Sequence, residues 1–126
     1  MHPYLVLKTL HVIGVLLVLV GVAGLATHAA TGRAKAENPV YLLLAALHGI
    51  GLLLVILCGF GMLAQVLRTP GMSSPLWATT KLVLWALFAV AAVVPYRWPR
   101  LARWVLGVAL PVLGAAAAVV AILKPF

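Results

Sequence analysis

Four long apolar stretches dominate this 126-residue chain and leave little room for any other kind of structure. A helix needs about 20 apolar residues to cross the hydrocarbon core of a bilayer. The stretches run from about residue 4 to 30, 40 to 67, 76 to 94 and 101 to 123, and the segments between them are too short to be domains. The sequence therefore predicts an all-α fold: one transmembrane domain over residues 1–126, built as an up-and-down four-helix bundle.

The composition supports a membrane protein and excludes several kinds of site. Apolar residues make up 66% of the chain and charged residues 8%, whereas soluble domains are about a quarter charged. Glu37 is the single acid, so catalysis by a carboxylate pair is excluded, and Cys58 is the single cysteine, so an internal disulfide is excluded. A net charge of +8 in so apolar a chain favours a lipid bilayer or an anionic ligand as partner. A nucleic-acid partner is not expected.

Prolines mark the starts of the predicted helices and interrupt one of them. Four of them lie at or near predicted helix starts, where a missing N–H costs nothing, and Asn38 and Ser74 are suited to cap two of these helices. Pro111 lies inside the fourth stretch and is expected to bend it. The same stretch carries a face of small residues suited to close packing. The prolines at the starts are Pro3, Pro39, Pro75 and Pro99, and the small face consists of Gly107, Pro111, Gly114, Ala118 and Ala121.

Basic residues in the short connecting segments predict the orientation. The 1–2 and 3–4 segments lie on one side and carry five cations: Arg33, Lys35, Arg97, Arg100 and Arg103. The other side has Lys8, Arg68 and Lys124, with Lys81 somewhat deeper. This excess predicts that both termini lie outside and that the 1–2 and 3–4 segments lie in the cytoplasm.

The first two predicted helices contain a repeat. The residues from Tyr4 to Val18 align without a gap on those from Tyr41 to Val55, with a Tyr, a His and a Gly at the same offsets. Successive spans run in opposite directions, so this repeat is inverted and its histidines lie near opposite faces of the membrane. The alternative is a chance match between two leucine-rich helices.

Ionisable residues inside a membrane span are costly and are candidates for function. Tyr4, Lys8 and His11 share one helix face, as do Trp77, Lys81 and Trp85, and both trios lie near the outer ends of their helices. Two lysines and a histidine without a carboxylate repel one another, and a ligand with acidic groups would relieve this repulsion. The alternative is that both lysines extend to the membrane surface.

Each repeated histidine is followed by a glycine three residues later. His11 precedes Gly14 and His48 precedes Gly51, which leaves space for a flat ring beside the imidazole. Haem uses neutral imidazole as an axial ligand, so His11 and His48 are candidate metal ligands. The alternative is a histidine bonded to a carbonyl, with the glycine serving helix packing. The two histidines differ in depth by more than 10 Å in this arrangement, so one shared iron is not expected. His28 is expected to be interfacial.

Two short motifs resemble a known group of proteins. Lys8-Thr-Leu-His11 and Trp77-Ala-Thr-Thr-Lys81-Leu are similar to motifs of small bacterial membrane proteins of the SirB, HemJ and CopD types. The length and helix order look most like SirB. The motifs look most like the HemJ-type protoporphyrinogen oxidases, in which a first-helix histidine and a third-helix lysine belong to the functional core. The resemblance implies a b-type haem. It also implies that His11 and Lys81 are functional residues, and it supports Lys8 less strongly.

Together with the resemblance, these observations predict a multi-pass protein of the bacterial inner membrane that binds a b-type haem or related tetrapyrrole, in electron transfer or haem handling. A quinone, a second copy of the chain or a partner membrane protein are further candidate partners. One alternative is a cofactor-free subunit or small transporter, and another is a HemJ-like oxidase. The expected cofactor-binding residues are Tyr4, Lys8, His11, Gly14, His48 and Lys81.

Overall fold

The computed structural model describes residues 2–68, 71 and 76–123, and these residues are almost entirely helical. Two helices of 27 residues come first, α1 (Pro3–Ala29) and α2 (Tyr41–Leu67), joined through the short 3-10 helix η1 (Lys35–Glu37). They are followed by α3 (Leu76–Ala91) and α4 (Val94–Arg97). The last part comprises η2 (Pro99–Leu101), α5 (Ala102–Trp104), the π-helix η3 (Val105–Ala109) and α6 (Leu110–Leu123).

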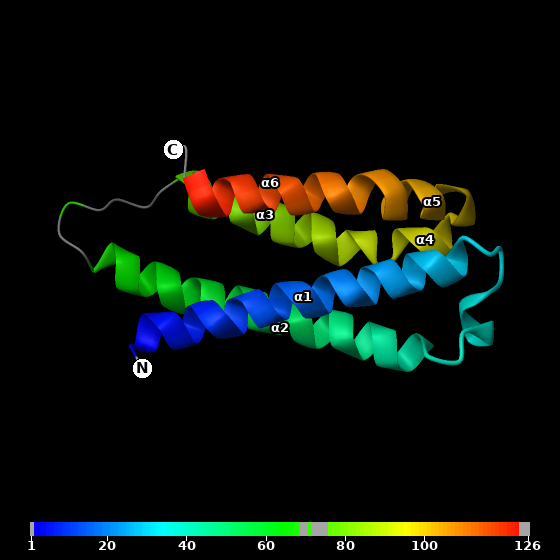
Figure 1. The fold of residues 1–126 in the computed structure, drawn as a ribbon, viewed down its shortest axis with the longest axis horizontal. Helices are drawn as coiled ribbons and strands as arrows, with labels where there is room; N and C mark the ends of the chain where they lie inside the picture. Colours follow the sequence, from blue (N-terminus) through cyan, green and yellow to red (C-terminus); the bar gives the residue numbers. More distant parts are fainter. Residues whose placement is uncertain (1, 69–70, 72–75, 124–126) are drawn as a thin grey trace.

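Among the described residues, four helical stretches are long and apolar enough to cross a membrane, as the sequence predicts. They are Pro3–Ala29, Tyr41–Leu67, Ala78–Arg97 and Pro99–Ile122. Figure 1 shows them in two layers, with α1 and α2 in one and α3 and α6 in the other. The outer surface is rich in large apolar side chains such as Leu42 and Ile122, which are 81% and 77% exposed. Such a surface suits contact with lipid.

Proline shapes the helix ends and breaks. Pro3 is the first residue of α1, and the Nδ1 of His2 accepts a hydrogen bond from the Tyr4 amide at 3.1 Å. Asn38 acts in the turn before α2, where its side-chain oxygen accepts from the Val40 amide at 3.0 Å. The predicted starts at Ser74 and Pro75 lie outside the described residues.

The third and fourth stretches are less regular than the sequence predicts. The third was expected to run to residue 94, but α3 ends at Ala91, and a turn precedes α4, whose second residue is Pro95. Near Pro111, where the sequence predicts a bend, the structure has the π-helix η3, which ends two residues before the proline. Proline has no N–H to donate and crowds the carbonyl four residues earlier, so a wider turn just before it relieves the clash.

Helices α1 and α2 pack closely because a glycine of each helix faces the backbone of the other. A Cβ at Gly14 would lie 2.9 Å from the carbonyl oxygen of Gly51, and a Cβ at Gly51 would lie 2.6 Å from that of Gly14. The small face expected on the fourth stretch makes no comparable contact, since a Cβ at Gly107 or Gly114 would meet no described atom within 4 Å. Close packing within the described part of the chain is therefore a property of α1 and α2.

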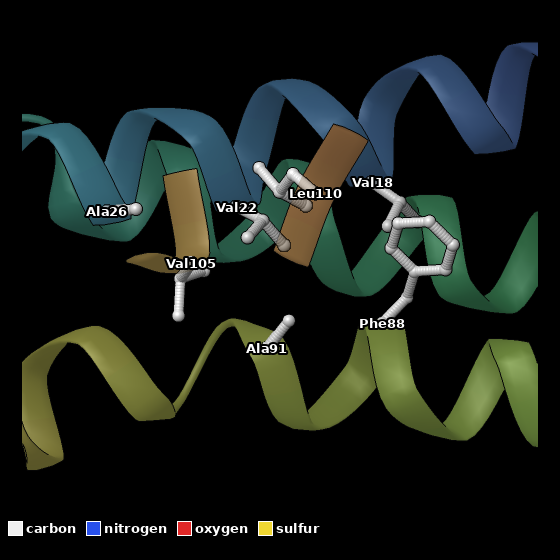
Figure 2. Close-up of a cluster of buried hydrophobic side chains, with 7 residues drawn as sticks. All are labelled: Val18, Val22, Ala26, Phe88, Ala91, Val105 and Leu110. Carbon is white, nitrogen blue, oxygen red and sulfur yellow. The ribbon is translucent and has the colours of Figure 1, made fainter. Parts of the chain in front are cut away.

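A buried apolar cluster joins the two layers (Figure 2). Val18, Val22 and Ala26 of α1 lie opposite Phe88 and Ala91 of α3, and Val105 and Leu110 complete the cluster from the fourth stretch. Val22 and Ala26 are wholly buried. This dry core occupies the middle of the molecule and separates its two ends, each of which carries polar side chains.

Candidate functional site

A cavity of about 200 Å³ lies where the N-terminal part of α1 meets the C-terminal half of α2 and the start of α3. We call it the N-terminal cavity. Its walls are mostly apolar, and its polar groups come from Tyr4, Lys8 and His11 of α1 and from Lys81 and Trp85 of α3. The two trios, which the sequence places near the outer ends of their helices, therefore meet here through these five residues. Trp77 belongs to α3, but its side chain lies outside the described part of the structure.

His11 is held in one orientation by α2. Its Nδ1 lies 2.9 Å from the carbonyl oxygen of Val55, and because a carbonyl oxygen accepts only, Nδ1 carries the hydrogen. The ring lies close to Gly59, where a Cβ would be 3.4 Å from the His11 Cε1 atom. In the neutral imidazole, Nε2 is then the unprotonated nitrogen. This is the arrangement of metal-ligating histidines, whose second nitrogen donates to a carbonyl or carboxylate.

Gly59 is a site residue that the sequence analysis missed. It lines the N-terminal cavity and leaves room for the His11 ring. The antiparallel pairing of Gly14 with Gly51 was the signal that could have located it, because that register places His11 within a turn of residue 55.

Two lysines make the cavity positively charged. Lys81 is partly buried, whereas Lys8 is exposed, and both line the cavity. Lys81 also lies within electrostatic reach of the His11 ring. The single acid of the chain, Glu37, is in η1 at the opposite end of α1 (Figure 1), where its side chain accepts from the Ala34 amide at 3.3 Å. Among the described side chains that line the cavity, a ligand therefore meets cations and no carboxylate.

Trp85 closes one side of this cavity. Its indole Nε1 donates a hydrogen bond to the carbonyl oxygen of Leu52 at 3.0 Å, so that α3 is tied to α2 at this level. Trp85 shares a helix face with Lys81, one turn away, and this bond fixes how that face meets the cavity.

Gly14 does not occupy the position expected of it. The prediction was that it leaves space for a flat ring beside His11, but the backbone of α2 fills that space. Leu54 contributes to the same contact, since its Cβ would lie 2.8 Å from a Cβ at Gly14. Gly14 serves helix packing, as the alternative interpretation held, and it is not among the residues that line the cavity.

His48 lies apart from the N-terminal cavity. Its side chain is 7% exposed, and a Cβ at Gly21 would lie 2.6 Å from the Cβ of His48. The backbone carbonyls of Val18 and Ala89 approach the ring, yet neither ring nitrogen has a hydrogen-bond partner within the described structure. His11 is ten residues from Gly21 on α1, which corresponds to about 15 Å along the helix. The two histidines thus stand at different levels.

The repeat of α1 and α2 is visible in these contacts. His48 and Val55 follow His11 and Val18 by 37 positions each, and Gly51 follows Gly14 by the same number. The ring of His11 meets the Val55 carbonyl, and the ring of His48 is approached by the Val18 carbonyl. Together with the reciprocal contact of Gly14 and Gly51, this gives the two helices matching environments about the point where they cross.

His28 belongs to a separate polar cluster at the other end of the molecule. Its Nδ1 lies 2.6 Å from the hydroxyl of Tyr96, which also accepts a hydrogen bond from the side-chain nitrogen of Asn38 at 3.0 Å. Asn38 is buried, and the cluster connects α1, the segment before α2, and α4. Its bonds account for His28 and Asn38 as structural residues.

The N-terminal cavity suits a haem by its donors and is smaller than a whole macrocycle needs. Among the described residues, no three His, Cys, Asp or Glu side chains gather as they would around a bare metal ion. A haem iron needs one or two axial ligands from the protein, and the fixed tautomer of His11 meets this need. The volume of about 200 Å³ is below the range of about 300–1,000 Å³ common for ligand pockets, so a macrocycle would extend beyond the cavity.

No protein-family model, no curated protein and no solved structure matches this chain.

Proposed function

We propose that this protein is a multi-pass bacterial inner-membrane protein, an up-and-down four-helix bundle, that binds a b-type haem or related tetrapyrrole in the N-terminal cavity. One observation carries the proposal: His11, with its Nδ1 engaged by Val55, shares a mostly apolar cavity with Lys8 and Lys81. A tetrapyrrole combines a metal to ligate, an apolar ring and acidic groups, and each has a counterpart in this cavity.

Each residue would have a distinct task. His11 would hold the metal through Nε2, while the Val55 carbonyl keeps the imidazole in the required tautomer. Lys81 and Lys8 would neutralise the acidic groups, and Trp85 would hold α3 beside the ring through its bond to Leu52. Bound haem supplies one-electron redox chemistry, which suits electron transfer or haem handling.

A second candidate function is a cofactor-free membrane subunit or small transporter. It is favoured by the packing role of Gly14 and by the carbonyl bond of His11, because both are what a structural histidine–glycine pair predicts. A HemJ-like oxidase and a quinone site remain proposals that rest on the quoted motifs and on the cavity, respectively.

An optical spectrum of the protein purified in mild detergent tests the proposal. We expect a Soret band, either as isolated or after titration with haem, at a stoichiometry of one haem per chain. The matched control is His11→Ala, which should show no such band. Absence of a band from the natural chain even with added haem would contradict haem binding and favour the cofactor-free subunit.

A further inference from the structure

An apolar groove of about 490 Å³ lies on the outer surface of the molecule, away from the N-terminal cavity. One wall consists of Leu87, Val90 and Val94, and the other includes Trp104, Val108 and Val112. Ala91 and Val105, both buried, form its floor. We call it the π-turn groove, because the π-helix η3 forms part of one wall.

Two breaks in helical structure border the groove. On one side, α3 stops at Ala91 and the chain turns before α4 begins at Val94. On the other side, α5 gives way to η3 ahead of Pro111. Regular helices pack with interdigitated side chains, whereas a broken helix and a π-turn leave a gap between their surfaces. The groove is thus built into the backbone of both stretches.

The length of the groove matches the depth of one leaflet. From Trp104 to Leu113 the wall advances nine residues, which corresponds to about 13 Å of helix. Half of the hydrocarbon core of a bilayer measures about 15 Å. An extended acyl chain from a single leaflet therefore fits along the groove, and its apolar walls offer no polar group that would oppose one.

Arginines cluster at one end of the groove. Arg103 precedes Trp104, Arg97 comes three residues after Val94, and Arg100 lies between them in η2. All three are exposed, and the chain holds one acid, Glu37, in the separate η1 segment. Trp104 is 66% exposed beside them, as is typical of tryptophan at the level of lipid headgroups. This end of the groove is complementary to an anionic headgroup.

We propose that the π-turn groove binds an anionic phospholipid, with one acyl chain along the groove and the phosphate beside Arg103, Arg100 and Arg97. The site lies apart from the N-terminal cavity and does not depend on haem. Each arginine near an anionic headgroup contributes enough to change lipid affinity about fivefold.

Native mass spectrometry of the full chain, released from detergent with equal amounts of phosphatidylglycerol and phosphatidylcholine, tests the site. We expect retention of one phosphatidylglycerol in preference to phosphatidylcholine. The double variant Arg100→Gln, Arg103→Gln should lose most of this preference. The matched control is Arg33→Gln, which removes an exposed cation from the segment between α1 and α2, whereas Arg103 is next in sequence to the groove residue Trp104.

A second pair of variants tests the groove itself. Ala109→Phe places a ring in the groove and should reduce retention of both lipids, whereas Val20→Phe on the exposed face of α1 should not. Equal retention of the two lipids by the natural chain would overturn the proposal. So would an equal loss of preference in Arg33→Gln and in the double arginine variant.

Discussion

The Nδ1 atom of His11 lies 2.9 Å from the carbonyl oxygen of Val55, so the backbone of α2 sets the tautomer and orientation of an imidazole on α1. The same two helices approach closely because Gly14 and Gly51 face each other. Gly14 lies three residues after His11 on α1, and Gly51 lies four residues before Val55 on α2. The packing of the glycines and the orientation of the histidine are therefore parts of one arrangement. A change in the glycine contact is expected to disturb the cavity as well as the stability of the helix pair.

Gly51→Ala tests this close packing. A Cβ there would meet the Gly14 carbonyl oxygen at 2.6 Å and the Val18 amide nitrogen at 2.7 Å, and both are backbone atoms that cannot rotate away. We expect a loss of about 1–3 kcal/mol in the free energy of unfolding, as for other overpacked interiors. Unfolding in mixed micelles with increasing denaturing detergent measures it.

Gly49→Ala is the matched control for that variant. A Cβ at Gly49 would meet no described atom within 4 Å, although the residue lies on the same helix two positions away. Alanine at such a position should leave stability unchanged or raise it by about 0.5–1 kcal/mol, because glycine weakens helix interiors. Similar losses in both variants would show that the glycines do not act through packing.

Trp85→Phe removes the indole N–H that donates to the Leu52 carbonyl at 3.0 Å while keeping an aromatic ring. We expect a loss of about 0.5–1.5 kcal/mol in unfolding free energy, the usual net value of one hydrogen bond. Trp104→Phe is the control, since that side chain is 66% exposed. An equal loss in the two variants would argue against the bond between α2 and α3.

The sequence alone predicted the number and approximate bounds of the four long helices, because apolar length is a property of each stretch by itself. It also placed Tyr4, Lys8 and His11 on one helix face at the same end of the bundle as Lys81, since helical spacing and the alternation of direction suffice for that. The sequence did not predict the break after Ala91, and it predicted a bend at Pro111 but not the π-helix before it. Apolar residues continue through both, so the pattern carries no sign of the change in backbone geometry.

The contacts of each histidine could not be predicted from the sequence for a related reason. Whether Gly14 borders a cavity or packs on Gly51 depends on the rotation of α1 about its own axis relative to α2. Both helices are apolar on every side, so periodicity does not fix this rotation as it does in a soluble amphipathic helix. The unpartnered nitrogens of His48 and the carbonyl bond of His11 follow from that rotation.

Lys81 gives a test of the charge in the N-terminal cavity. If its ammonium pairs with an acidic group of the ligand, Lys81→Met should weaken haem affinity about tenfold or more, as expected for a lost hydrogen bond to a charged group. Lys81→Arg should keep much of the affinity because the charge remains. Haem titration followed at the Soret band measures both. Equal affinity in the two variants would remove Lys81 from the site.

The orientation in the membrane is tested by a fusion after Phe126. The cations of the 1–2 and 3–4 segments predict that these segments face the cytoplasm and that both termini lie outside. A reporter that is active only in the cytoplasm should then stay silent, while the same reporter inserted after Arg33 should be active. The reverse result would invert the orientation and leave the four long helices unchanged.

His11 and His48 have matching positions in the repeat, but their surroundings predict different roles. His11 opens onto a cavity that Lys8 and Lys81 also line, whereas His48 is buried among helix backbones and lies outside that cavity. A ligand with a metal and acidic groups therefore finds both a histidine and cations only at His11. We therefore expect His11→Ala to abolish bound chromophore, and His48→Ala to lower it or leave it unchanged. The haem-to-protein ratio of the two purified variants measures this difference. Loss in His48→Ala with retention in His11→Ala would place the site at the other histidine, and half occupancy in each would indicate two equivalent sites.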